Sequence, residues 1–333
     1  MNRNVHRSSL AIGAVMAMAG CGGSSGGDPA SDGTGSISFS VTDAPVDDAA
    51  AVVIAMTEFE LKPSGDRSPF KVPVVGAPRQ LNLLEFTDGA SAEIIVDEEV
   101  PAGEYEWLRI YFDQELSFIQ LESDGTMFPL FIPSGAQTGY KLESGFTVPL
   151  NDDVEYLLDF NVRESVIEPP GLAGPNGEPR TFLLKPTVRI MNVEETGGVQ
   201  GIVSSDLVDL SNARCALADP PLSGNAVYVF EGVDAQLDDV AEEEADERSG
   251  PLTSDVVDLN VGTGLYEYHL MALLPGLYTL AFTCSGMADG AGDDDYPAPS
   301  DSGFDFDATT SVEVVSGVVE TCDIGSLGPS GPC

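Results

Sequence analysis

Tyr105-Glu-Trp-Leu-Arg-Ile-Tyr-Phe112 is the stretch that decides the fold, because its apolar and aromatic residues recur with a period of two. Successive side chains of a β-strand point to opposite faces of the sheet. The stretch therefore predicts a strand with Leu108, Ile110 and Phe112 on one face and Tyr105, Trp107 and Tyr111 on the other. Proline and glycine in Val100-Pro-Ala-Gly103 indicate a turn before it, and Ala92–Val96 is the strand expected ahead of that turn.

Short runs with the same strand period continue along the chain, separated by Gly, Pro and Asp. Helical periodicity is nearly absent. The first group of predicted strands is Ser36–Val41, Ala51–Leu61, Leu116–Leu121, Thr126–Ile132, Tyr140–Leu150, Glu155–Val162 and Phe182–Asn192. The second group is Val199–Val203, Ala226–Phe230, Tyr266–Leu270, Leu273–Phe282 and Ser311–Val315. This pattern predicts an all-β fold of two β-sandwiches, of the immunoglobulin or transthyretin type.

Four motifs of the first group carry a resemblance to a known family. They are Thr42-Asp-Ala-Pro-Val46, Ile132-Pro-Ser-Gly-Ala-Gln-Thr-Gly-Tyr-Lys-Leu142, Leu158-Asp-Phe-Asn-Val-Arg163 and Leu184-Lys-Pro-Thr-Val-Arg189. Residues 35–193 thereby resemble the domain of unknown function 4382 family, which occurs in bacterial exported lipoproteins. Tyr140 and Asn161 depart from its usual residues. The resemblance implies a β-rich envelope domain and no assigned activity.

Residues 194–198 are the predicted linker to a second, strongly acidic domain at 199–333. Its Leu273-Leu-Pro-Gly-Leu-Tyr-Thr-Leu280 turn and strand, between the other strands of the second group, resembles carboxypeptidase-regulatory-like domains. That family implies a small transthyretin-like sandwich, of the kind used as a stalk, spacer or binding module.

The N-terminus indicates export. Arg3 and Arg7 precede the apolar run Leu10–Ala19, and Gly20-Cys21 follows at once, as in a secretory signal peptide. Met18-Ala-Gly-Cys21 resembles the bacterial lipobox. The resemblance implies a signal peptide at 1–20, cleavage between Gly20 and Cys21, and lipidation of Cys21. The alternative is an ordinary signal peptide with an incidental cysteine.

Residues 21–34 are rich in Gly, Ser and Asp, which predicts a flexible tether. Gly22, rather than Asp, favours the outer membrane by resemblance to Gram-negative lipoproteins. We therefore expect a protein anchored in the bacterial outer membrane by its lipid, on the cell surface or on the periplasmic side.

The chain is very acidic, with 55 Asp and Glu against 14 Lys and Arg. Without Arg3 and Arg7, 12 basic residues remain and the formal charge is −43. Nucleic acid and anionic lipid surfaces are excluded as partners, because binding phosphates requires positive charge. An envelope glycan or protein remains a possible partner, beside the membrane that holds the anchor.

Five cysteines divide into Cys21, which the lipid would use, and four in the C-terminal part. Export permits disulfides, and four cysteines allow three pairings. We favour Cys215–Cys284 and Cys322–Cys333, because the second pair would restrain the chain end.

Enzyme motifs are scarce. His269, alone in a predicted strand, is the only histidine after the signal peptide, and no cysteine pair has zinc-site spacing. We therefore expect a non-catalytic adhesion, ligand-binding or structural module. The alternative is an envelope glycan hydrolase that uses paired carboxylates.

Two binding hypotheses remain. Asp293, Asp295, Asp301 and Asp305 lie in a loop punctuated by Gly and Pro and predict a calcium site, since calcium prefers several oxygen ligands; no other cofactor is expected. Trp107, Tyr105 and Tyr111 predict a platform for sugar rings, unless that face is buried between two sheets.

Overall fold

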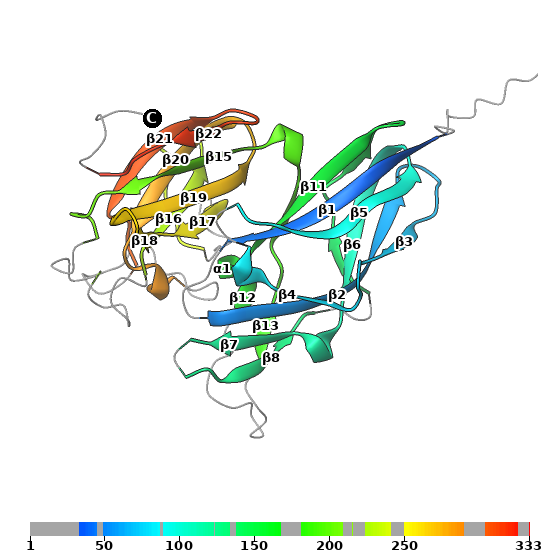
Figure 1. Ribbon diagram of the computed structural model, residues 1–333, viewed down its shortest axis with the longest axis horizontal. Coiled ribbons are helices and arrows are strands. Elements are labelled where there is room, and N and C mark those ends of the chain that lie inside the picture. Colours follow the sequence, from blue (N-terminus) through cyan, green and yellow to red (C-terminus); the bar gives the residue numbers. More distant parts are fainter. Residues whose placement is uncertain are drawn as a thin grey trace, which may run out of the picture.

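The structure of the protein is a computed structural model (Figure 1). It describes residues 33–44, 49–86, 89–122, 124–133, 138–167, 181–208, 215, 224–240, 250–289, 304–325 and 333. The fold is all-β, as predicted: the strands form one ten-stranded and three four-stranded sheets. In the described part of the chain, no helix has the length and apolar character needed to cross a membrane.

The first sandwich pairs a four-stranded sheet, sheet 1, with the ten-stranded sheet, sheet 2. Sheet 1 has the order β14-β11-β1-β5 and contains β14 (Val188–Asn192), β11 (Asp153–Asn161), β1 (Thr34–Ala44) and β5 (Ala92–Pro101). Sheet 2 contains β2 (Ala49–Pro63), β3 (Phe70–Pro73), β4 (Arg79–Asn82), β6 (Gly103–Phe112), β7 (Phe118–Leu121), β8 (Met127–Phe131), β9 (Tyr140–Leu142), β10 (Phe146–Val148), β12 (Val166–Ile167) and β13 (Phe182–Leu184).

The alternation in β1 explains how sheet 1 buries one face. Ile37, Phe39 and Val41 are fully buried in the core shared with sheet 2. Ser36, Ser38 and Ser40 therefore point to the other face. β1 runs parallel to β11 and antiparallel to β5, so β5 forms an edge of sheet 1.

Two predicted strands are each two strands in the structure. Tyr140–Leu150 divides into β9 and β10, which both pair with β6. Phe182–Asn192 divides into β13 in sheet 2 and β14 in sheet 1. Pro186 lies between β13 and β14, and because proline has no N–H it cannot continue a hydrogen-bonded ladder.

The second sandwich pairs two four-stranded sheets, sheet 3 and sheet 4. Sheet 3 contains β18 (Asp258–Asn260), β19 (Leu265–Leu273), β15 (Gly197–Val203) and β22 (Val319–Thr321). Sheet 4 contains β17 (Thr253–Val256), β16 (Ala226–Glu231), β20 (Gly276–Thr283) and β21 (Ala308–Val314). Gly197 and Gly198 of the predicted linker already belong to β15, after the 3-10 helix η3 (Val193–Glu195).

Both favoured disulfides are present, and both lie in the second sandwich. Cys215–Cys284 joins residues 69 apart in the sequence, and Cys322–Cys333 joins residues 11 apart. The N–H of Cys333 donates to the Ser311 carbonyl at 2.9 Å, which places the chain end beside β21. The second disulfide therefore restrains the chain end, as expected.

The two sandwiches meet at the short helix α1 (Val162–Ser165), near the middle of the molecule (Figure 1). Arg163 of α1 is 3% exposed, and its guanidinium donates to the Gly286 carbonyl of the second sandwich at 2.8 Å. The same guanidinium lies 5.5 Å from the ring centre of Tyr228 in β16. Arg163, the last residue of the third motif (Leu158–Arg163), thus connects the two sandwiches.

Candidate functional site

The outer face of sheet 2 around Trp107 combines aromatic and charged side chains from four strands. We call it the Trp107 face and define it by Glu58 and Glu60 of β2, Lys71 of β3, Trp107, Arg109 and Tyr111 of β6, and Lys141 of β9. Leu108, Ile110 and Phe112 of β6 point the other way and are buried in the core, as predicted. Trp107, Arg109 and Tyr111 remain partly exposed.

Tyr105 does not belong to this face, which corrects the prediction. The pairing of β2 with β6 shifts register between Trp107 and Tyr105, so that Glu106 forms a β-bulge. A bulge adds one residue and turns the side chains beyond it to the other face. Tyr105 is consequently 2% exposed, stacks on Phe146 with ring centres 4.7 Å apart, and donates to the Pro101 carbonyl at 2.7 Å.

Strand register brings the charged residues into a row across the sheet. Glu60 is paired with Lys71 on one side and with Arg109 on the other, and Arg109 is paired in turn with Lys141. Arg109 Nη1 lies 3.4 Å from Glu60 Oε2, and the Tyr111 hydroxyl donates to the same oxygen at 3.1 Å. Glu60 therefore accepts hydrogen bonds from both Arg109 and Tyr111.

Cations cover the aromatic rings of the Trp107 face. Arg109 Cζ lies 4.9 Å and Lys141 Nζ 5.4 Å from the Trp107 ring centre, and Lys71 Nζ lies 4.2 Å from that of Tyr111. Lys71 also pairs with Glu58, and this hydrogen bond raises the pKa of Lys71. Lys141 pairs with Glu143 at 2.7 Å and lowers the pKa of that carboxyl. Each cation of the face thus pairs with a carboxylate and lies over an aromatic ring.

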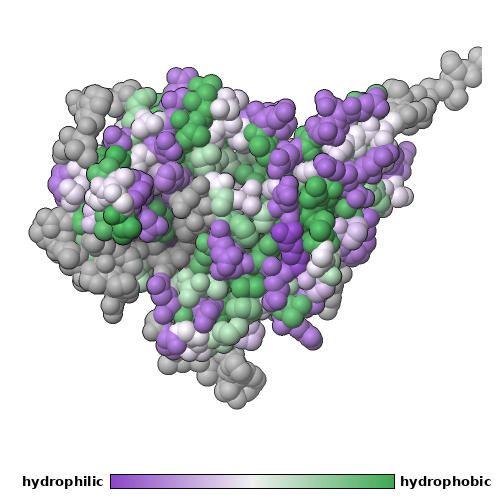
Figure 2. Space-filling model, viewed as in Figure 1, coloured by the Kyte–Doolittle hydropathy of each residue, from purple (hydrophilic) through white to green (hydrophobic). Residues whose placement is uncertain are grey.

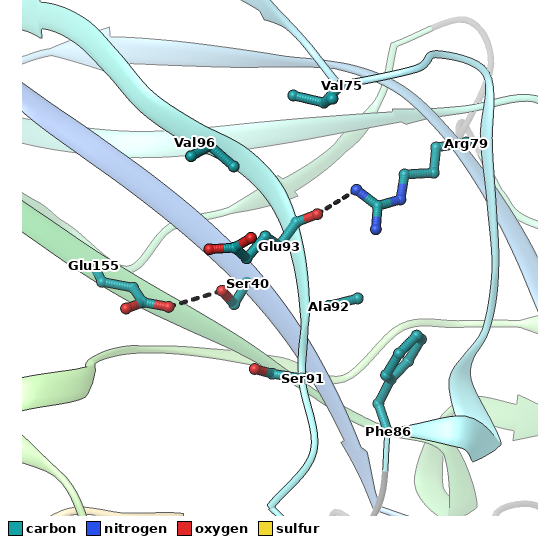
Figure 3. Close-up of a pocket in the computed structure, with 9 residues that line it drawn as sticks. All are labelled: Ser40, Val75, Arg79, Phe86, Ser91, Ala92, Glu93, Val96 and Glu155. Carbon is teal, nitrogen blue, oxygen red and sulfur yellow. Dashed lines mark hydrogen bonds between the residues drawn. The ribbon is translucent and has the colours of Figure 1, made fainter.

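A second candidate site is an open hollow of about 640 Å³ beside β5 (Figure 3). Its lining residues are Ser40, Val75, Arg79, Phe86, Ser91, Ala92, Glu93, Val96 and Glu155. The Ser40 hydroxyl donates to Glu155 Oε1 at 2.8 Å, and Arg79 donates to the Glu93 carbonyl. Apolar and hydrophilic surface meet on this side of the first sandwich (Figure 2). Glu93 and Glu155 are both exposed, whereas a glycosidase acid is kept protonated by burial.

The other predicted site residues lie apart from these surfaces. Gly20, Cys21, Asp293, Asp295 and Asp301 are outside the described residues. Asp305 is described, and its carboxylate accepts from the Phe306 N–H at 2.9 Å. His269 lies in β19, where its backbone N–H donates to Asp255 at 2.7 Å. The described residues contain no group of three or more His, Cys, Asp or Glu arranged to hold a metal ion.

The cations of the Trp107 face and the whole hollow were missed by sequence reasoning. Alternation within Glu58-Phe-Glu-Leu-Lys62 could have indicated a charged outer face on β2. Lys71 of β3 and Lys141 of β9 join the face through the register of strand pairing. The residue pattern of a single strand does not reveal that register.

Comparisons with known proteins give weak structural similarities. The chain aligns to a leucine-rich repeat protein from Bacteroides thetaiotaomicron at 10% identity and a TM-score of 0.19, over 88% of this chain and 26% of that one. It aligns to the minor pilin GBS52 of Streptococcus agalactiae at 11% identity and a TM-score of 0.17, over 89% and 99%. The Bacillus anthracis TIE protein aligns at 10% identity and a TM-score of 0.17, over 87% and 50%. The chain thus spans about a quarter of the first of these proteins.

No curated protein matches the sequence. A family model does match within the first sandwich, and it covers three of the four motifs completely and the start of the fourth, as far as Pro186. The resemblance of residues 199–333 to carboxypeptidase-regulatory-like domains stays a prediction. Residues 34–186 match the family described as "Domain of unknown function (DUF4382)".

Proposed function

We propose that this protein is a non-catalytic, lipid-anchored module of the cell envelope that binds a neutral polysaccharide on the Trp107 face. The observation that supports the proposal is the partly exposed pair Trp107 and Tyr111, set in a row of charged hydrogen-bonding groups on a sheet surface. One ring face of a sugar presents C–H groups and packs on aromatic side chains, while its hydroxyls bond with carboxylates, guanidinium and ammonium groups.

The charge balance of the face favours a neutral ligand. Its cations Lys71, Arg109 and Lys141 are matched by Glu58, Glu60 and the neighbouring Glu143. The whole chain carries a formal charge of −41, which would repel a polyanion. The side chains already bond with one another, so little conformational entropy is lost when a ligand binds.

The single tryptophan makes the test direct, because tryptophan fluorescence, excited selectively over that of the nine tyrosines, reports on this face alone. The full chain with Cys21→Ser would be titrated with hexamers of β-1,4-linked glucose, N-acetylglucosamine and xylose. We expect a saturable fluorescence change with at least one of them. Trp107→Ala, followed by calorimetry, should weaken that binding at least tenfold.

The matched control is Phe131→Ala, which removes an aromatic side chain that is 47% exposed on β8 of the same sheet. Its affinity should equal that of the parent chain. If none of the three hexamers changes the fluorescence, or if both alanine variants bind equally well, the Trp107 face is not the binding surface.

The anchor is tested separately. β1 begins at the end of the first sandwich that is remote from the second sandwich (Figure 1). The predicted flexible tether of residues 21–34 would join this end of the first sandwich to a lipid on Cys21. Cys21→Ser should release the protein from the membrane fraction. Biotinylation of intact cells then separates a surface location from a periplasmic one, and no release by Cys21→Ser would exclude the lipid anchor.

A further inference from the structure

Arg79, in the hollow beside β5, forms no ion pair with another described residue. Lys62, Lys71, Arg109, Lys141 and Arg189 do form such pairs. The one hydrogen bond of Arg79 goes to a backbone carbonyl, that of Glu93. A guanidinium has five N–H donors in a planar fork that fits a carboxylate. Arg79 therefore has N–H donors left for a ligand, although the chain contains 55 acidic residues.

The wall beside Arg79 is apolar. Val75 and Val96 line the hollow and are 55% and 42% exposed, and Phe86 stands below the guanidinium (Figure 3). The Val75 N–H donates to the Ile94 carbonyl at 3.1 Å, which fixes that segment to β5. The Thr42 hydroxyl lies 2.9 Å from the carbonyls of Phe86 and Ala90, which fixes Phe86 to β1. The apolar wall is held in place from both sides.

The opposite side of the hollow is acidic. Glu93 and Glu155 lie across β5 from Arg79, together with Ser40 (Figure 3). Ser40 is 1% exposed and holds the Glu155 carboxylate by its hydroxyl. The hollow thus has a guanidinium on one side of β5, two carboxylates on the other side, and apolar side chains above and below them (Figure 3).

We propose that this hollow binds a zwitterionic ligand with an apolar body, of the class of short apolar peptides. Its carboxylate would pair with Arg79, its ammonium group with Glu93 and Glu155, and its side chains would pack on Val75, Val96 and Phe86. Such a ligand is neutral overall, so the negative charge of the chain does not repel it. About 640 Å³ is ample for a dipeptide and lies within the usual size of small-ligand pockets.

The experiment pairs ligand caps with protein variants. Binding of the dipeptide Phe-Leu to the full chain with Cys21→Ser is compared by calorimetry with its N-acetyl form and its C-terminal amide. We expect each cap to weaken binding at least tenfold, because each removes one charged contact. In Arg79→Gln the free dipeptide and the amide should bind equally, while the acetyl form stays weaker. In the double variant Glu93→Gln/Glu155→Gln the free dipeptide and the acetyl form should bind equally, while the amide stays weaker.

Lys141→Gln, on the Trp107 face, is the matched control. It should still bind the acetylated and the amidated dipeptide at least tenfold more weakly than the free dipeptide. Far-UV circular dichroism checks that each variant is folded. The proposal is overturned if Phe-Leu does not bind at millimolar concentration, or if Arg79→Gln leaves the difference between free and amidated dipeptide unchanged. Trp107→Ala should not alter dipeptide binding, so this site and the proposed polysaccharide face can fail independently.

Discussion

Two arginines of this protein lie over aromatic rings at similar distances, in opposite environments. Arg109 Cζ is 4.9 Å from the Trp107 ring centre, on the outer face of sheet 2. Arg163 Cζ is 5.5 Å from that of Tyr228, between the two sandwiches. The Arg109 side chain is 27% exposed, whereas Arg163 is 3% and Tyr228 0% exposed. Both are contacts between a guanidinium and an aromatic ring, and they differ in how far burial excludes water from them.

A cation over a ring contributes about 0.5–1 kcal/mol at an exposed site and about 2 kcal/mol or more when water is excluded. Arg163 also donates to the Gly286 carbonyl, and the Tyr228 hydroxyl donates to Asp289 Oδ2 at 2.6 Å. The buried pair therefore belongs to a network that joins the sandwiches. The exposed pair contributes little to stability, and its groups remain accessible to solvent.

The largest expected effect is that of Arg163→Met. The variant keeps most of the side-chain volume but leaves the buried Gly286 carbonyl without this donor and Tyr228 without its cation. We expect the free energy of unfolding to fall by about 3 kcal/mol, from the lost charged hydrogen bond and the desolvated ring contact. Urea denaturation followed by circular dichroism measures it.

Arg109→Met is the matched comparison, with the same substitution over the other ring. Its cost should stay below about 1 kcal/mol, as for exposed pairs. Equal costs for the two variants would mean that burial does not separate the two arginines, and the contrast drawn between them would be wrong.

The strand pattern could predict much of this contrast on the exposed side. Alternation in Tyr105–Phe112 identified the outward Trp107 and Tyr111 and the buried Leu108, Ile110 and Phe112. It misplaced Tyr105, because a bulge is set by pairing with β2 and not by the strand itself. Arg163 looked like one residue of a family motif; its partner Gly286 is 123 residues away. The hollow could not be predicted, because it depends on the hydrogen bond between Val75 and Ile94 of β5. No local sequence pattern indicates that contact.

The second prediction uses the buried tyrosines. Burial raises the pKa of Tyr105 to about 12 and raises that of Tyr268 as well. Above about pH 10 tyrosines ionise in the unfolded chain, while these two stay protonated in the folded one. The unfolded state then binds fewer protons, so stability falls as pH rises. Melting temperatures between pH 8 and 11.5 should fall by several degrees. Tyr105→Phe should flatten the decline, and an unchanged slope would contradict the burial of Tyr105.

A third prediction concerns the acidic segment that contains Asp293, Asp295, Asp301 and Asp305. If calcium binds through Asp293, Asp295, Asp301 and Asp305, EDTA should lower the melting temperature by a few degrees, because a ligand of the folded state stabilises it. Calcium added in excess should restore the loss, whereas magnesium should not, since calcium accepts the larger and less regular ligand set. An identical melting temperature with and without EDTA would remove the calcium hypothesis.

The smallest expected effect is that of Lys71→Gln on the Trp107 face. Lys71 pairs with Glu58 and covers Tyr111, but its side chain is 48% exposed. Exposed pairs contribute about 0.5 kcal/mol and are screened by salt. The loss of unfolding free energy should therefore be near the error of a urea titration, and it should vanish in 1 M NaCl. Lys71 touches the ring that a polysaccharide would use, so the same variant should still weaken hexamer binding. A loss of stability as large as that of Arg163→Met would show that the face is held together for structure, and a polysaccharide site there would lose its main support.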